Sequence, residues 1–159
     1  MIRLRLAALL LSALALPVLA QDGDGKDRAV DAIYGAWSLD TDKFAEEMAN
    51  APEFQAMPEE DRKAQLESFK MLTAEFLFAD GTLTVSGTMM SDEEKHEMTC
   101  KVVEKDGSHW VLEVKEADKE QPEKAVVEWL ADDSIRFSIV GAEEGSEEVK
   151  VTFPLTKKS

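Results

Sequence analysis

Short alternations of apolar and polar residues, separated by turn residues, run through the second half of the chain and restrict it to a β-rich fold. In the first of them an Asp-Gly pair lies between Phe76, Phe78, Leu83 and Val85. Asp-Gly flanked by alternating apolar residues is typical of a two-residue β-hairpin. That turn pairs Phe78 with Leu83 and Phe76 with Val85, and directly opposed residues share a face. The sequence therefore predicts an antiparallel meander with one apolar face.

The next hairpin needs one extra residue to keep its apolar side chains together. A two-residue turn at Asp106-Gly107 would put the apolar sets of its two strands on opposite faces. A bulged turn, with Gly107 left-handed, instead pairs Val102 with Trp110 and Cys100 with Leu112. The burial pattern favours the bulged turn.

The same reasoning predicts that loop 132–134 pairs Trp129 with Phe137 and Val127 with Ile139. Regular spacing of short strands suggests a sandwich or barrel, and closure removes exposed sheet edges. We expect a mainly β fold, an eight-stranded antiparallel meander forming a closed or half-closed barrel. The expected strands are 35–39, 75–79, 82–88, 96–104, 109–116, 124–131, 134–140 and 148–155.

Two short helices are predicted between the first and second strands. Asp40 or the residue after it can cap a helix whose apolar stripe includes Phe44 and Met48. Pro58 suits the first position of a second helix, which carries Phe69 on its apolar face.

Residues 1–20 have the features of a secretory signal peptide. Arg3 and Arg5 precede an apolar run, and residues 18–20 place small side chains before a cut. The run is too short to span a membrane and Pro17 breaks it, which favours a removable signal over a retained anchor. The mature protein is therefore expected to be periplasmic or secreted.

The rest of the chain is expected to form one domain. Residues 21–32 are mostly polar and predict a flexible leader, and residues 33–156 would form the barrel. The formal net charge is −15 at pH 7. Such a charge repels nucleic acids and anionic lipid surfaces, so we expect neither as a partner, and no membrane span.

Catalytic groups are sparse in this sequence. His96 and His109 are its two histidines, and the single cysteine, Cys100, lies in an apolar alternation where an unreactive thiol is expected. No Ser-His-Asp set or glycine-rich phosphate loop is present. Two carboxylates across a cleft would suffice for a glycosidase, which stays open. We expect a protein that is not an enzyme and has no cofactor.

One stretch carries soft metal ligands. His96, Met98 and Cys100 alternate on one strand face, and Met90 could approach across a turn. Imidazole, thioether and thiol select Cu(I), so periplasmic copper binding through His96 and Met98 is one alternative. Same-face neighbours lie about 6.6 Å apart along a strand, which is too far for three to share a metal without a bulge.

A strand opening with Gly35-Ala-Trp37, a helical excursion and then a meander resemble the lipocalin-like (calycin) families. Phe78 opens a variant of their Phe-x-x-Asp-Gly-Thr motif, and the similarity extends over about residues 33–155. The chain looks especially like the small exported bacterial proteins with this domain. In lipocalins an Arg late in the barrel packs on the Trp, whereas the expected last strand here has Lys150.

The resemblance implies an apolar cavity in the barrel and a small apolar ligand. We expect the pocket to open towards the two helices, which would act as its lid. The alternative is a core filled by its own aromatic side chains, in an envelope module that binds a protein partner. The predicted pocket residues are Trp37, Phe44, Met48, Phe69, Phe76, Trp110, Trp129 and Phe137.

Overall fold

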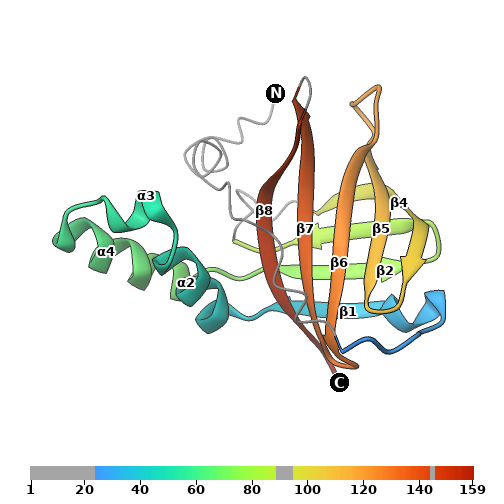
Figure 1. Cartoon of the computed structure of the whole chain (residues 1–159), viewed down its shortest axis with the longest axis horizontal. Helices are drawn as coiled ribbons and strands as arrows, with labels where there is room; N and C mark the ends of the chain where they lie inside the picture. Colours follow the sequence, from blue (N-terminus) through green and yellow to red (C-terminus); the bar gives the residue numbers. More distant parts are fainter. Residues whose placement is uncertain (1–23, 89–94, 144–145) are drawn as a thin grey trace.

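A computed structural model describes residues 24–88, 95–143 and 146–159. Within these residues, eight antiparallel strands follow one another around a closed barrel in chain order (Figure 1). The last strand pairs with the first through Trp37 and Lys157, which closes the wall. The predicted eight-stranded meander is confirmed, in its closed form. The strands are β1 (Gly35–Leu39), β2 (Glu75–Ala79), β3 (Thr82–Ser86), β4 (His96–Asp106), β5 (His109–Glu116), β6 (Glu123–Ala131), β7 (Ser134–Glu143) and β8 (Ser146–Lys157).

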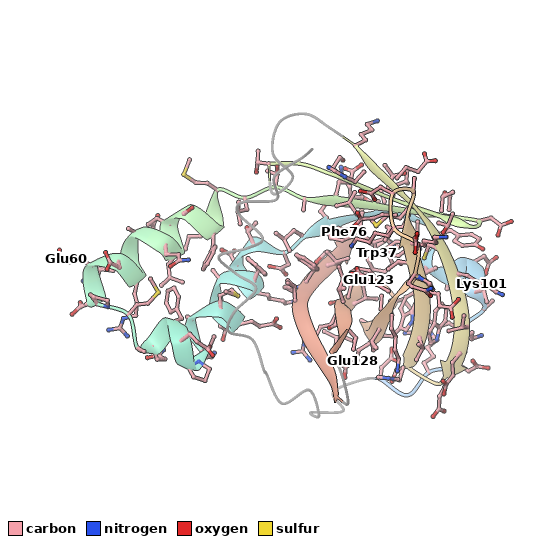
Figure 2. The ribbon with its side chains drawn as sticks, turned by 90° about the horizontal axis from the view of Figure 1, so that it is seen from above. Trp37, Glu60, Phe76, Lys101, Glu123 and Glu128 are labelled. Atoms are coloured by element: carbon pink, nitrogen blue, oxygen red, sulfur yellow. The ribbon has the colours of Figure 1, made fainter. Side chains whose placement is uncertain are left out.

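Three helices, not the predicted two, connect β1 to β2: α2 (Thr41–Ala49), α3 (Pro52–Gln55) and α4 (Glu59–Lys70). Asp40 caps α2 by accepting a hydrogen bond from the Lys43 backbone N–H at 3.1 Å. The additional helix begins at Pro52, because proline is tolerated in a first helical turn. These helices form a lobe beside the barrel, and Figure 2 places Glu60 of α4 far from Trp37 and Phe76.

The Asp-Gly hairpin between β2 and β3 has the predicted register, with Phe78 opposite Leu83. The hairpin between β4 and β5 differs from the prediction. It turns tightly between Asp106 and His109, and the extra residue lies in the strand, as a β-bulge at Val103. Val102 therefore faces Leu112, not Trp110. A bulge in the strand corrects the facing of the side chains just as a longer turn would.

The hairpin between β6 and β7 also has a different register. Trp129 pairs with Ile135 rather than with Phe137, and the ladder is irregular after Trp129. The observed pairing differs from the predicted one by two residues along the partner strand. A shift of two leaves every side chain on its original face, so the predicted buried face is correct although the partners are not.

Aromatic rings fill much of the barrel interior. Trp129 makes edge contacts with Trp37 and Trp110, with ring centres 5.7 and 5.1 Å apart. Phe137 contacts Phe76 and Phe78 at 5.6 and 5.8 Å. Such pairs add about 0.5–1.5 kcal/mol each beyond the area that they bury. Ring packing is therefore a main source of stability in this chain.

The indole of Trp37 is held by the residues before β1 and by the end of β8. Its Nε1 donates to the carbonyl of Ile33 at 2.8 Å, and the ammonium of Lys157 lies 5.3 Å from its ring centre. Lys157 also donates to the carbonyl of Ala32 at 2.9 Å. A lysine two residues beyond the expected end of the strand thus packs on the Trp, as the Arg does in the resembled family.

Residues 24–29, part of the predicted flexible leader, pack against the end of the barrel and continue into the 3-10 helix η1 (Val30–Ile33). The Asp24 backbone N–H donates to the carbonyl of Trp129 at 3.1 Å. Arg28 is 7 % exposed, and its guanidinium pairs with Asp24 and Asp132. One buried arginine therefore docks a segment whose composition alone is typical of a mobile terminus.

Candidate ligand-binding cavity

The eight predicted pocket residues are buried, and they form two connected parts of the core. Five lie inside the barrel. The other three, Phe44, Met48 and Phe69, lie on α2 and α4. Phe44 stacks on Phe153 of β8 at 6.2 Å and meets Phe69 edge-on at 5.6 Å. The helical residues thus join their lobe to the barrel.

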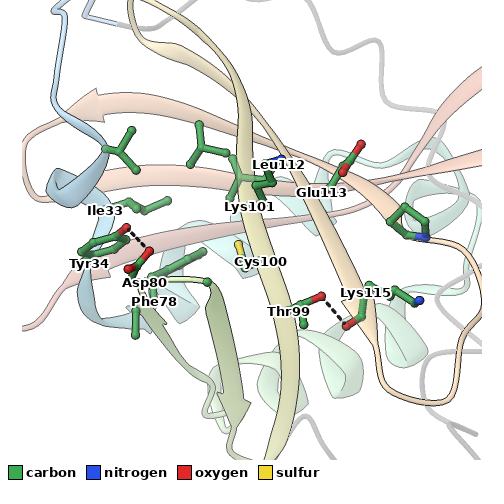
Figure 3. A pocket seen from close by; sticks show the side chains of 15 residues that line it. Ile33, Tyr34, Phe78, Asp80, Thr99, Cys100, Lys101, Leu112, Glu113 and Lys115 are labelled. Atoms are coloured by element: carbon green, nitrogen blue, oxygen red, sulfur yellow. Dashed lines mark hydrogen bonds between the residues drawn. The ribbon is translucent and has the colours of Figure 1, made fainter.

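A cavity of about 520 Å³ lies at another place, between η1, the β2–β3 turn and β4 (Figure 3). None of the eight predicted residues lines it, and neither do residues of α2 to α4. This cavity therefore does not open towards the helices. Its walls are Val30, Ile33, Tyr34, Phe78, Ala79, Asp80, Gly81, Thr99, Cys100, Lys101, Val102, Leu112, Glu113, Lys115 and Pro122.

The opening results from a difference in strand length. The ladder between β3 and β4 ends at the pair Thr82–Thr99, and one further hydrogen bond, from the Cys100 N–H to the Gly81 carbonyl at 2.9 Å, follows. In the described chain, residues 101–106 of β4 pair with β5 alone. The free edge of β4 beside Gly81 thus forms a gap in the barrel wall, which we call the side portal.

The inner wall of the cavity is apolar. Ile33, Phe78 and Leu112 are each 2 % exposed or less, and Val102 packs against the same core. Burial raises the pKa of the Cys100 thiol to about 11, so that this group is neutral at physiological pH. A neutral, buried thiol behaves as a small hydrophobic group. The wall is apolar, and its side chains are packed so closely that little of their surface faces the opening.

The rim of the cavity is polar. The Tyr34 hydroxyl donates to Asp80 at 3.3 Å (Figure 3). Burial, followed by the charge of Asp80, raises the pKa of Tyr34 above its ordinary value, so the phenol is neutral at pH 7. On the outer side of β4 and β5, Lys101 lies opposite Glu113.

Of the described residues that line the cavity, none is a histidine, and the cysteine and tyrosine among them are protonated at pH 7. His96 and Met98 alternate with Cys100 along β4, opposite Val85 and Leu83 of β3. Among the residues that the structure describes, no three His, Cys, Asp or Glu side chains are grouped so as to hold a metal ion. Met90, the fourth suggested copper ligand, lies outside the described residues.

Reasoning from the sequence missed Tyr34, Phe78, Val102 and Leu112 as cavity residues, although it placed Phe78 inside the barrel. A signal was present, since the strand predicted over 96–104 is longer than its neighbour over 82–88. A long strand beside a short one must extend past it, and this overhang creates the portal.

Neither protein-family models nor curated proteins give a match to this chain. In the described part of the chain, no helix has both the length and the apolar character needed to cross a membrane. The closed eight-stranded antiparallel barrel agrees with a lipocalin-like fold.

Proposed function

We propose that this protein is a non-catalytic, exported, lipocalin-like protein that binds a small apolar ligand in the cavity behind the side portal. The observation that carries the proposal is an apolar-walled space of about 520 Å³ that is open at one side of a filled barrel. Sites for small molecules measure about 300–1,000 Å³ and combine apolar walls with a few polar groups. Ile33, Phe78 and Leu112 supply the walls here, and Tyr34 with Asp80 supplies polar groups at the mouth.

Two further observations support the lipocalin-like and exported parts of this proposal. The Gly-x-Trp start of β1 is combined with a cation on the Trp37 ring, from Lys157. The charged start, apolar run and small residues over 1–20 are typical of a cleaved export signal. A periplasmic or secreted location follows from that signal, and N-terminal sequencing of the protein from its host would test it. An intact residue 1 would contradict it.

The cavity offers a direct test, because Cys100 is the single cysteine of the chain and part of the cavity wall. An apolar ligand in the cavity should slow modification of this thiol by a maleimide at pH 8.5. The high thiol pKa makes the reaction slow, which allows manual sampling and mass spectrometry. A suitable probe is 1-decanol below its solubility limit. Equal modification rates with and without bound decanol would contradict binding at this cavity.

A neighbouring pair of residues supplies a matched control. Val102 lines the cavity, whereas Val103, in the bulge, is 44 % exposed. Val102→Trp should place a large ring inside the space and weaken decanol binding. Val103→Trp adds the same ring outside and should leave binding unchanged. Decanol binding as tight in Val102→Trp as in the wild type would show that the cavity is not the site.

One observation favours the alternative, an envelope module with a filled core that binds a protein partner. The rings of Trp37, Trp110 and Trp129 contact one another across the barrel, so the central space is already occupied. In that case no apolar probe would bind the wild-type protein or protect Cys100 from modification. The Val102→Trp variant would give the same result.

A further inference from the structure

The outer surface of β4, β5 and β6 carries rows of side chains that run across the three strands. Leu112, Ala125 and Val127 are buried inside the barrel, so the residues that alternate with them along the strands face outwards. Directly opposed residues share a face, and the strand register therefore defines the rows. The first row is Lys101, Glu113 and Lys124, and the third row is Asp106, His109 and Glu128.

The second row, between these two, is apolar at its centre. Val111 of β5 lies directly opposite Val126 of β6, and both are half-buried. The bulge in β4 places Val103 and Glu104 together opposite Val111, and Val103 is 44 % exposed. Glu104 is exposed at the end of this row, beside the side portal, where its carboxylate can stay in water. A strip of three valines thus separates two polar rows, and we call the whole surface the three-row face.

The first and third rows carry complementary groups on each strand. On β4 the first row has the ammonium of Lys101 and the third row has the carboxylate of Asp106. On β5 the first row has the carboxylate of Glu113 and the third row has His109, whose ring carries an N–H donor in both of its protonation states. The face therefore contains, on each of these two strands, both members of a polar pair.

A second copy of the same face can bring these members together. Two copies facing each other about a twofold axis along the valine row place the first row of each against the third row of the other, with like strands across from one another. Lys101 then meets Asp106 of the second copy, and Glu113 meets His109 of the second copy. Because the axis is twofold, each contact occurs twice.

The charges also exclude the other simple orientation. A twofold axis along β5 would bring Lys101 of one copy to Lys124 of the other and would place Glu113 against itself. On β6, the axis along the valine row puts Lys124 opposite Glu128, which are again of opposite sign. Both of these residues already have interactions within their own chain, so the contacts of β4 and β5 decide the orientation.

We propose that this protein forms a weak, reversible dimer with a second copy of itself through the three-row face, with the valine rows in contact along the twofold axis. The helical lobe leaves this face open, because Figure 2 places Lys101 and Glu128 on the side of the barrel away from Glu60 of α4. A face three strands wide covers less than the about 800 Å² per partner of a stable complex, which makes the dimer weak.

The net charge of the chain does not prevent this association at physiological salt. Two copies with a formal net charge of −15 each repel one another. Salt screens exposed charges separated by more than about 8 Å, whereas the facing pairs of the dimer would be closer than that. The dimer requires no ligand, so it goes beyond the proposed function and can fail or hold independently of it.

Sedimentation velocity measures the dimer of the purified protein. The weight-average sedimentation coefficient of the wild type should rise between about 10 µM and about 1 mM, the range in which weak complexes associate. Lys101→Glu and Asp106→Lys each create two like-charge contacts and should each weaken the dimer about tenfold. Lys63→Glu and Glu60→Lys make the same charge changes on α4 and should leave the dimer constant unchanged.

Mixing the two face variants gives the decisive result. A heterodimer of Lys101→Glu with Asp106→Lys has opposite charges at both β4 contacts, so an equal mixture should associate about as tightly as the wild type. A disturbed fold in either variant could not be repaired by mixing. A wild type that stays monomeric, a mixture as weak as the separate variants, or equal weakening by the α4 variants would each contradict the proposal. Unchanged dimers in Lys101→Glu would place the interface elsewhere and overturn it as well.

Discussion

The guanidinium carbon of Arg28 lies 4.5 Å from the ring centre of Trp129. The same group donates to Asp24 at 2.9 Å and to Asp132 at 3.1 Å, and the Arg28 side chain is 4 % exposed. This contact joins the leader to an indole that itself touches two other tryptophans. Tryptophan emission should therefore report whether the leader is docked.

Loss of Arg28 should destabilise the fold more than loss of a nearby exposed cation. A partly desolvated cation–π contact and its hydrogen bonds contribute about 1–2 kcal/mol, so Arg28→Ala should lower the unfolding free energy by about that much. Lys26→Ala, which removes the exposed ion pair with Asp132, should change it by less than about 0.5 kcal/mol. Urea unfolding followed by fluorescence measures both. Equal losses would contradict the special role of Arg28.

Acid should weaken leader docking over a defined range. Hydrogen bonding to Arg28 lowers the pKa of Asp24 from 3.8 to about 2. A carboxyl with a depressed pKa stabilises the native state above pH 3.8, and this contribution is lost as the pH falls through about 2. The difference in stability between wild type and Asp24→Asn should therefore be constant above pH 5 and should shrink towards pH 2. A difference that does not change with pH would contradict this, and Asp42→Asn on α2 serves as the exposed control.

Two glycines with positive φ should respond differently to alanine. Gly81 has φ of +77° with open space around it, whereas at Gly87, with φ of +127°, a Cβ would overlap the backbone of Thr73. Gly81→Ala should cost about 1 kcal/mol for the left-handed conformation alone. Gly87→Ala should cost more, because the clash is with main chain that cannot rotate away. Thermal unfolding ranks the two, and the opposite order would show that the loop at 87 relaxes freely.

The bulge at Val103 makes a test of the observed register possible. Trp110 is 0 % exposed and donates from Nε1 to the Gly107 carbonyl at 3.1 Å. Trp110→Ala should lower the unfolding free energy by about 3–5 kcal/mol. Val103→Ala, at an exposed site, should change it by no more than about 0.5 kcal/mol. A large effect at Val103 would mean that the extra residue lies elsewhere.

The periodicity of the sequence was sufficient to predict the strands, and it identified β1, β2 and β5 with their observed ends. It could not place the bulge, because one extra residue at Gly107 or at Val103 leaves the same side chains buried. Which of these two positions carries the extra residue depends on how the whole barrel closes. Alternation along single strands contains no information about closure.

The candidate cavity was predictable in kind but not in place. The lipocalin-like resemblance suggested a pocket lined by aromatic side chains inside the barrel, whereas these rings pack on one another, as in the alternative of a filled core. The cavity arises where β4 extends past the end of β3 and where residues 30–34, which follow the leader, pack beside this part of β4. Neither relationship is local in the sequence. The docking of the leader through Arg28 likewise depends on Trp129, about a hundred residues away.

Pairing of β1 with β8 has a consequence for how the protein is made. Trp37 meets Lys157 across the closing ladder, so a growing polypeptide holds its first strand without its final neighbour until residue 157 has emerged. Contacts between such distant residues form late and slowly. Until then the edge of β1 that faces β8 has no hydrogen-bonding partner, and the barrel cannot close.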